Sequence, residues 1–204
     1  DISKCVQQEE LLMNTPFIST KKLDLSGNVK VGCQGMDGSN SNTAADLLFN
    51  SPNIVYYHEF EDVFKAVDNG DVKFGVLPVQ NSTTGSIIQI YDLMKKYDFY
   101  VARMVRVEID HCLAVKKNTN FNNVKNVYSH PQALSQCSAF ISENNLRAIP
   151  YENTATAAKF ISQSNEPLAA ICSERCANMY DFNIIAKNIA DSSPNYTRFI
   201  CISK

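Results

Sequence analysis

The feature that most constrains the fold is an alternation of two sequence patterns that begins near Val29. Short apolar runs, which are typical of buried strands, alternate with segments whose apolar residues repeat at helical spacing. The first three pairs are "VKVGC" with residues 41–49, "IVYY" with residues 60–68, and "KFGVLPV" with residues 86–97. In the second pair the apolar residues fall on one helical face, at Phe60, Val63, Phe64 and Val67. Strands that alternate with helices predict mostly parallel sheets with helices on their faces.

A second unit of the same kind follows a long extended stretch, "DFYVARMVRVEIDHCLAV", whose β-branched and aromatic residues favour strand. Alternation then resumes with "VKNVYS", a helix over about 131–141, "RAIPY", a helix over about 153–163, "LAAIC" and a short helix after Ser173. Two such units joined by extended crossings predict two α/β lobes with a cleft between them. We expect lobe 1 to comprise residues 29–106 and 187–204, lobe 2 residues 107–186, and residues 1–28 a helix remnant and linker.

The composition narrows the classes of function. A chain of 204 residues with 45% hydrophobic and 20% charged residues is typical of a globular protein. The net charge of -2 and the lack of a long basic run argue against a nucleic-acid surface. No apolar stretch of membrane-spanning length and no export signal is visible in the sequence. We therefore expect a cytoplasmic protein that binds neither nucleic acid nor membrane.

The cysteines support a reducing compartment. Their number, seven, is odd, and they lie in apolar contexts such as "ICSERC" and "FICI". This pattern indicates small buried residues rather than a disulfide framework. Cys172 and Cys176 lie four residues apart without a second pair or a nearby histidine, so no metal site is expected.

Three turns that follow strands share one chemistry. They are "GMDGSNSN" at 35–42, "QNSTTGS" at 80–86 and "YSHPQ" at 128–132, and each is expected to enter a helix. Hydroxyl and amide side chains at a helix start surround unpaired N–H groups, which makes an anion site. The alternative is capping alone, because Ser86 with Gln89 and Ser129 with Gln132 have capping-box spacing. Three such turns at the carboxyl ends of strands favour a small polyanion as ligand.

The glycine motifs of nucleotide-binding sites and the single histidines give weaker evidence of a site. Gly32, Gly35 and Gly38 have GxxGxxG spacing rather than the dinucleotide pattern GxGxxG, and no P-loop pattern occurs. His111 lies in an apolar run, which favours a core histidine over a base. His58 is expected to be exposed near the end of a strand.

Taken in order, the motifs resemble the prephenate dehydratase family. The matching segments are "VGCQGMDGSNSNTAA", "FEDVFKAVDNGDVKFGVLPVQNSTTGSI", "IDHCLAV", "VYSHPQALSQCSAFI", "YENTATAA" and the Thr-Arg-Phe stretch at Thr197–Phe199. The resemblance covers about Val29 to Ile202. It implies a fold like type II periplasmic binding proteins, with the active site between two α/β lobes. It also implies loss of CO2 and water from prephenate to give phenylpyruvate in phenylalanine biosynthesis, without metal or organic cofactor.

The resemblance also implies roles for individual residues. Thr197 matches the catalytic threonine, and the positions that line the site are matched by Asn81, Ser129 and Gln136. Threonine is too weak an acid to give up its proton freely, so we expect Thr197 to donate a short hydrogen bond to the departing oxygen. Further candidates for substrate contacts are Ser39, Ser82, Thr83, His130 and Arg198. His130 could instead be a cap or a packed ring, and Arg198 could form a structural ion pair.

This chain departs from the family at two positions. Gln80, a further catalytic candidate, stands where the family commonly has glutamate, and a glutamine cannot exchange a proton at neutral pH. Asn40 stands where the family usually has an aromatic residue. Many relatives continue into an ACT regulatory domain beyond the position of Lys204, so we expect no feedback by that route in this chain.

Several alternatives stay open from the sequence. The chain could be an arogenate dehydratase, or a non-catalytic pair of ligand-binding lobes, an idea that Gln80 makes conceivable. A homo-oligomer is expected, because relatives in this family usually pair. The first residues resemble the last helix of a chorismate mutase domain, which implies that such a domain is fused upstream.

Overall fold

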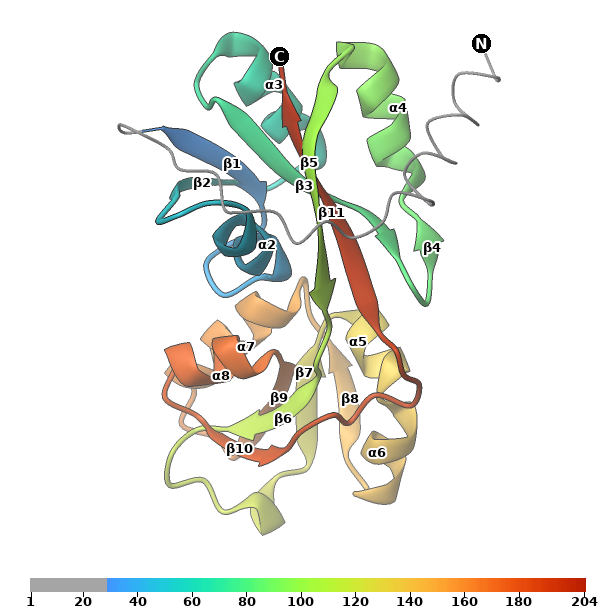
Figure 1. The fold of residues 1–204 in the computed structure, drawn as a ribbon. Helices are drawn as coiled ribbons and strands as arrows, with labels where there is room; N and C mark the ends of the chain where they lie inside the picture. Colours follow the sequence, from blue (N-terminus) through green and yellow to red (C-terminus); the bar gives the residue numbers. More distant parts are fainter. Residues whose placement is uncertain (1–28) are drawn as a thin grey trace.

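The computed structural model describes residues 29–204, which form two α/β lobes stacked one above the other (Figure 1). The segment at 1–28, expected to be a helix remnant and linker, lies outside the described residues. In Figure 1 the upper lobe holds β1 to β5 and β11, and the lower lobe holds β6 to β10. The two-lobed α/β fold expected from the sequence is confirmed.

The upper lobe is built on a six-stranded sheet of order β2-β1-β3-β11-β5, with the short β4 paired to β3. Its strands are β1 (Lys30–Gln34), β2 (Asn53–Tyr57), β3 (Phe74–Asn81), β4 (Gly85–Ser86), β5 (Tyr100–Glu108) and β11 (Tyr196–Ser203). Its helices are α2 (Asn40–Leu48), α3 (Phe60–Asn69) and α4 (Ile88–Tyr97).

The lower lobe is built on a five-stranded sheet of order β10-β6-β9-β7-β8. Its strands are β6 (Cys112–Val115), β7 (Asn126–Ser129), β8 (Arg147–Pro150), β9 (Leu168–Cys172) and β10 (Asn183–Ala186). Its helices are the 3-10 turn η1 (Phe121–Asn123), α5 (Pro131–Gln136), α6 (Ser138–Glu143), α7 (Thr154–Gln163) and α8 (Glu174–Met179).

Apart from the short hairpin strand β4, each sheet contains one reversed strand, and in each case it is the strand that enters from the other lobe. In the upper sheet β11 runs antiparallel to both β3 and β5, whereas β1 pairs parallel with β2 and β3. In the lower sheet β6 runs antiparallel to β9 and β10, whereas β7 pairs parallel with β8 and β9. The prediction of mostly parallel sheets is therefore wrong: the sheets are mixed, because each crossing strand is inserted between strands of the opposite direction.

The core of the upper lobe has two halves, one on each face of its sheet. Along β11 the side chains alternate between them, with Ile200 and Ile202 in one apolar cluster and Phe199 and Cys201 in the other. This period-two pattern is that of a strand buried on both faces. β11 is thus buried on both faces of the sheet, between β3 and the edge strand β5.

Most expected elements are present, with a few differences. The helix expected at 86–97 begins at Ile88, because Gly85–Ser86 pair with β3 instead. The helix expected at 131–141 is divided at Cys137 into α5 and α6. The strand β10 was not predicted. No helix within residues 29–204 is long and apolar enough to cross a membrane.

Candidate active site

A cavity of about 450 Å³ lies between the two lobes. The upper lobe contributes the ends of β1 and β3, the first residues of β11 and the start of α2. The lower lobe contributes the starts of α5 and α7, and the passage from β5 to β6 supplies Ile109 and His111. The cavity is therefore lined from both lobes and from one of the two segments that join them.

Three of the helices that begin at this cavity, α2, α5 and α7, are capped by a side chain, whereas α3 and α4, whose N-cap residues Glu59 and Ile87 also line it, have no such cap. In α2, Ser39 Oγ accepts from the Asn42 N–H at 3.3 Å. In α5, His130 Nδ1 accepts from the Gln132 N–H at 3.1 Å. In α7, Asn153 accepts from the Thr156 N–H at 2.8 Å within a complete capping box. The remaining N–H groups of these first turns make this face of the cavity favourable for anions.

Two of the three predicted anion turns are thus at helix starts, and the third is not. Residues 80–86 form a hairpin between β3 and β4, and α4 begins after Ile87 without a side-chain cap. The Ser86–Gln89 capping box is therefore wrong. The Ser129–Gln132 box is also wrong, because the buried Ser129 hydroxyl donates to the Ile171 carbonyl at 2.6 Å and His130 is the cap. The third capped helix start at the cavity is that of α7, which was not among the three predicted turns.

Thr197 and Asn81 form a pair across β11 and β3, where they lie opposite each other. The Asn81 side-chain oxygen accepts from the backbone N–H groups of Thr83 and Thr84, at 2.9 and 3.2 Å, so its amide nitrogen must point the other way. That nitrogen donates to the Thr197 hydroxyl oxygen at 3.0 Å. Because the Thr197 oxygen accepts from Asn81, its own hydrogen is left for a different acceptor.

A chain of side-chain amides continues from this pair. Asn81 Nδ2 also lies 3.5 Å from Asn195 Oδ1, and Asn195 Nδ2 donates to Gln136 Oε1 at 3.1 Å. His111 Nε2 lies 2.8 Å from the same Gln136 oxygen. His111, expected to be a core histidine, is 6% exposed and also lines the cavity. Burial lowers its pKa, which favours a neutral ring.

The charged groups of the cavity gather at one exposed rim. His58 Nδ1 lies 2.8 Å from Glu59 Oε1, and Nε2 lies 2.9 Å from Glu152 Oε1. Hydrogen bonds to Glu59 and Glu152 raise the pKa of His58. Since Glu152 precedes α7, this bond joins the two lobes across the cavity rim. Among the described residues that line the cavity there is no lysine or arginine, so its inner donors are amides, hydroxyls and backbone N–H groups.

A second set of bonds joins the lobes beside α2. Arg175 of α8 pairs with Asp46 at 2.5 Å and donates to the Asn42 side-chain oxygen at 3.0 Å. Gly38 lies close to the same helix: a Cβ atom there would come within 2.9 Å of Met179 Cε. The observed spacing of the lobes is therefore supported by contacts on more than one side of the cavity.

Residues 31–204 match the family model described as prephenate dehydratase. The chain belongs to the prephenate dehydratase family. It is 34% identical over 205 residues to arogenate dehydratase/prephenate dehydratase 2, chloroplastic, of Arabidopsis thaliana. The alignment covers 98% of this chain and 54% of that protein. It is 38% identical over 147 residues to a bifunctional chorismate mutase/prephenate dehydratase of Buchnera aphidicola, which covers 71% of this chain and 38% of that protein.

Among solved structures, the prephenate dehydratase of Staphylococcus aureus matches with a TM-score of 0.73 at 25% identity, over 86% of this chain and 66% of that chain. The family is therefore shown by sequence, and the two-lobed fold agrees with it. The chain spans only about half the length, or less, of the two relatives compared above.

Half of the residues predicted for the site of this prephenate dehydratase family member line the cavity. They are Ser39, Asn81, His130, Gln136 and Thr197. Ser39 and His130 are also the caps of α2 and α5, so capping and a place at the cavity coexist in the same side chains. Asn40, where the family usually has an aromatic residue, lines the same cavity and leaves a polar wall there.

Gln80 and Arg198, both predicted for the site, do not line the cavity. Side chains alternate along a strand, so Arg198 lies on the opposite face of the sheet from Thr197, and Gln80 on the opposite face from Asn81. On that far face Arg198 Nη1 donates to Gln80 Oε1 at 3.1 Å. This bond joins Arg198 to a neutral amide, so it is not the structural ion pair given above as the alternative for Arg198.

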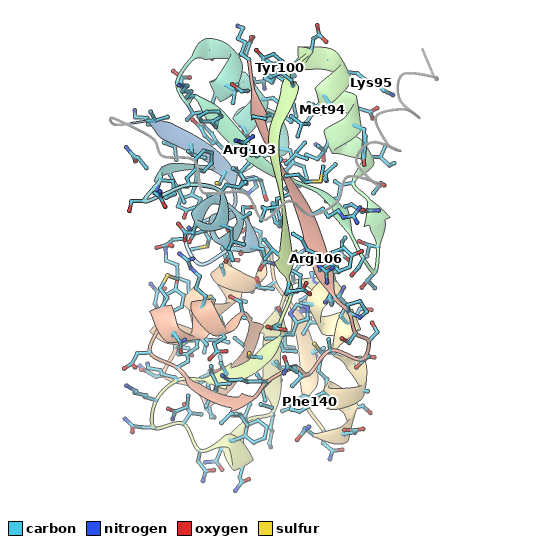
Figure 2. All side chains as sticks on the ribbon, viewed as in Figure 1. Met94, Lys95, Tyr100, Arg103, Arg106 and Phe140 are labelled. Carbon is cyan, nitrogen blue, oxygen red and sulfur yellow. The ribbon has the colours of Figure 1, made fainter. Side chains whose placement is uncertain are left out.

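The far face of the sheet continues onto β5. Arg106 lies opposite Arg198 in register, and Figure 2 shows it where β5 passes between the lobes. Its guanidinium group lies 4.0 Å from the centre of the Tyr196 ring, and it pairs with Glu108 at 2.5 Å. The arginines near Thr197 therefore contact protein groups on the face away from the cavity.

The other three predicted residues have structural bonds and also do not line the cavity. The Ser82 hydroxyl donates to the Pro194 carbonyl and accepts from the Tyr196 N–H, which ties the hairpin to the segment before β11. The Thr83 N–H is used to orient Asn81. The Ser129 hydroxyl is committed to the Ile171 carbonyl.

Sequence reasoning missed Asn195, Glu152, Asn153 and the role of His111. Asn153 carries a usable signal, because Asn-x-x-Thr before an apolar run is typical of a helix start. Asn195 and His111 carry none by themselves, since their bonds to Gln136 depend on how the two lobes meet.

Proposed function

We propose that this chain converts prephenate to phenylpyruvate, with loss of CO2 and water, in phenylalanine biosynthesis. The observation that carries the proposal is the hydroxyl of Thr197, buried at the cavity and oriented by Asn81 at 3.0 Å so that its hydrogen is left for a ligand. Membership of the prephenate dehydratase family supports the same reaction.

The cavity suits a substrate with two carboxylates. The starts of α2 and α7 offer N–H groups, and neutral amides and hydroxyls line the interior. The two acidic residues of the lining, Glu59 and Glu152, are engaged with His58 at the rim. The substrate carboxylates are held by helix starts and amide donors, away from these two side chains.

The reaction needs alignment more than a strong acid. The bond from the ring to its carboxylate breaks to release CO2, and the electron pair enters the ring. The bond from the opposite ring carbon to its hydroxyl oxygen breaks, and that oxygen leaves as water with a proton that ultimately comes from solvent. Because the ring becomes aromatic, little further driving force is required. Thr197 donates a hydrogen bond to the departing oxygen as negative charge develops on it.

The test is the rate of phenylpyruvate formation from prephenate by the purified chain, compared with the spontaneous rate at the same pH. Turnover that is lost when Thr197 is replaced by Val supports the proposal. A parent chain that does not exceed the spontaneous rate contradicts it.

A sister activity has one observation in its favour, since the Arabidopsis relative is named for both arogenate and prephenate. Arogenate carries an amine in place of the keto group, so rates on both substrates under the same conditions decide between them. The third hypothesis, a non-catalytic binder, predicts binding of prephenate without phenylpyruvate. This hypothesis depended on Gln80 in place of a glutamate at the site, but Gln80 does not line the cavity.

We also propose a reducing compartment, the cytoplasm, because the six described cysteines are free and buried. The name of the Buchnera relative supports the proposal that a chorismate mutase domain is fused upstream. A homo-oligomer is proposed as well, and light scattering coupled to gel filtration tests it.

A further inference from the structure

The two ends of the Gln136 side-chain amide have different surroundings. Its oxygen is close to two potential donors, Asn195 Nδ2 at 3.1 Å and His111 Nε2 at 2.8 Å. Its nitrogen, Nε2, is buried and has no hydrogen-bond partner among the described residues. A buried N–H group without an acceptor is costly, on the order of 1–3 kcal/mol. A side chain at the cavity with such a nitrogen indicates a ligand that supplies the acceptor.

The donor and acceptor of each side-chain hydrogen bond between Asn81, Asn195 and Gln136 can be assigned by starting from the backbone N–H groups that contact Asn81. The N–H groups of Thr83 and Thr84 can only donate, so Asn81 presents its oxygen to them and its NH2 group to the opposite side. There Thr197 Oγ1 at 3.0 Å and the Tyr196 carbonyl at 3.2 Å accept from it, and Asn195 Oδ1 lies 3.5 Å away. An NH2 group of Asn195 in that place would face the NH2 group of Asn81, so Asn195 turns its oxygen toward Asn81 and donates to Gln136 with its nitrogen. The Gln136 atom that receives this bond must be its oxygen.

The same logic assigns the hydrogen on His111. Because the Gln136 oxygen cannot donate, His111 Nε2 must carry the hydrogen of this bond. Burial lowers the pKa of His111, so the ring is neutral near pH 7 and its Nδ1 has no hydrogen. A flipped Gln136 amide would place its NH2 group against two donors, which disfavours the flip.

We propose that His111 and Asn195 are positioning residues, which hold the oxygen of Gln136 from two sides so that its Nε2 hydrogens meet an oxygen of the bound substrate. The acceptor is a carboxylate or carbonyl oxygen of prephenate. This proposal rests on the proposed function, because it names prephenate as the ligand. Neither residue contacts the reacting atoms; both act through Gln136.

The first test needs neither a variant nor activity. Nitrogen-15 NMR of the imidazole rings distinguishes a ring hydrogen on Nε2 from one on Nδ1. We expect His111 in the ligand-free protein to show the Nε2–H form near pH 7. A hydrogen on Nδ1, or a doubly protonated ring, would overturn the bond directions on which the proposal depends.

The second test measures coupling. Asn195→Asp keeps the shape of the side chain but removes the donor to Gln136, so we expect kcat/KM for prephenate to fall by about tenfold to a hundredfold. In a Gln136→Ala background the same substitution should change kcat/KM far less, because the residue through which it acts is gone. Equal losses in both backgrounds would show that Asn195 acts independently of Gln136.

The matched control is Asn165→Asp, which makes the same change at an exposed position that does not line the cavity. Thermal unfolding of each variant separates lost folding from lost positioning. If the parent binds prephenate in calorimetry but does not turn it over, the proposed reaction fails, and the coupling is then measured in Kd. If the parent shows no binding of prephenate, the substrate contact proposed for Gln136 is wrong, whatever form His111 has.

Discussion

Replacing Thr197 with Val removes one hydroxyl and keeps the branched shape that suits its strand. Thr197 is 8% exposed, and the one bond lost with the hydroxyl oxygen is that from Asn81 Nδ2 at 3.0 Å. That nitrogen keeps the Tyr196 carbonyl as an acceptor at 3.2 Å, so it is not left unpaired. The structural cost is therefore that of one ordinary hydrogen bond, about 0.5–1.5 kcal/mol.

A new buried methyl group offsets part of this cost, by about 0.8 kcal/mol at most. The net loss of folding free energy should stay near or below 1 kcal/mol, which lowers Tm by roughly 2–4 °C in a domain of this size. The loss of rate should be much larger. Removing a donor to developing charge costs about 10²–10³ in kcat, or about 2.7–4 kcal/mol.

The assay is the initial rate of phenylpyruvate formation at saturating prephenate, with thermal unfolding measured on the same samples. Thr197→Ser is the matched control, because it keeps the hydroxyl and loses only a methyl group; we expect it to retain most of the parent rate. A Val variant that turns over within about threefold of the parent would refute the role of the hydroxyl, since that is under 1 kcal/mol. A Ser variant as slow as the Val variant would assign the effect to the methyl group.

Three further predictions follow from the geometry. Gln80→Glu should leave the pH dependence of turnover unchanged, because the side chain pairs with Arg198 on the face away from the cavity. Glu152→Gln should lower Tm at acid pH more than at alkaline pH: hydrogen bonds raise the pKa of His58 in the folded protein, so the stabilisation is full below about pH 6.5 and is lost as the pH rises through the raised value. Gly38→Ala should cost about 1–2 kcal/mol of stability, because φ there is +81°, and should raise KM through its contact with the other lobe.

Each of these has an outcome that contradicts it. A new acid limb in the rate of the Gln80→Glu enzyme would return position 80 to the chemistry. A Tm difference for Glu152→Gln that does not change with pH would mean that His58 does not titrate in this bond. Gly70→Ala is the control for Gly38→Ala, because φ is +78° there with nothing within 4 Å of the new Cβ. If both substitutions raise KM equally, the contact near Met179 is irrelevant.

The elements could be predicted from sequence wherever a local pattern determines them. The helical face of residues 60–68 and the apolar run at 168–172 both became the expected elements. Strand direction could not be predicted in this way, because it depends on pairs far apart in the chain, such as Thr197 with Asn81. The error about parallel sheets has this origin.

Among the residues predicted for the site, Thr197 and Asn81 line the cavity, and for both the motif and the strand pattern agree. Strand alternation, applied to the same motifs, places Arg198 and Gln80 on the other face of the sheet from sequence alone. The bonds of Asn195 and His111 to Gln136 could not be predicted from the sequence, because they form only where three separate segments of the chain meet.

The position of β11 also bears on the order in which the protein can be made. Residues 112–186, which contain the whole lower sheet, leave the ribosome before any part of β11. In the upper sheet β11 lies between β3 and β5 and pairs with both, so Tyr196–Ser203 are the last part of this sheet to be synthesised, and they also contain Thr197. A nascent chain that stops before Tyr196 therefore lacks both the strand between β3 and β5 and the hydroxyl of Thr197. The upper sheet is therefore completed by the same strand that supplies the Thr197 hydroxyl.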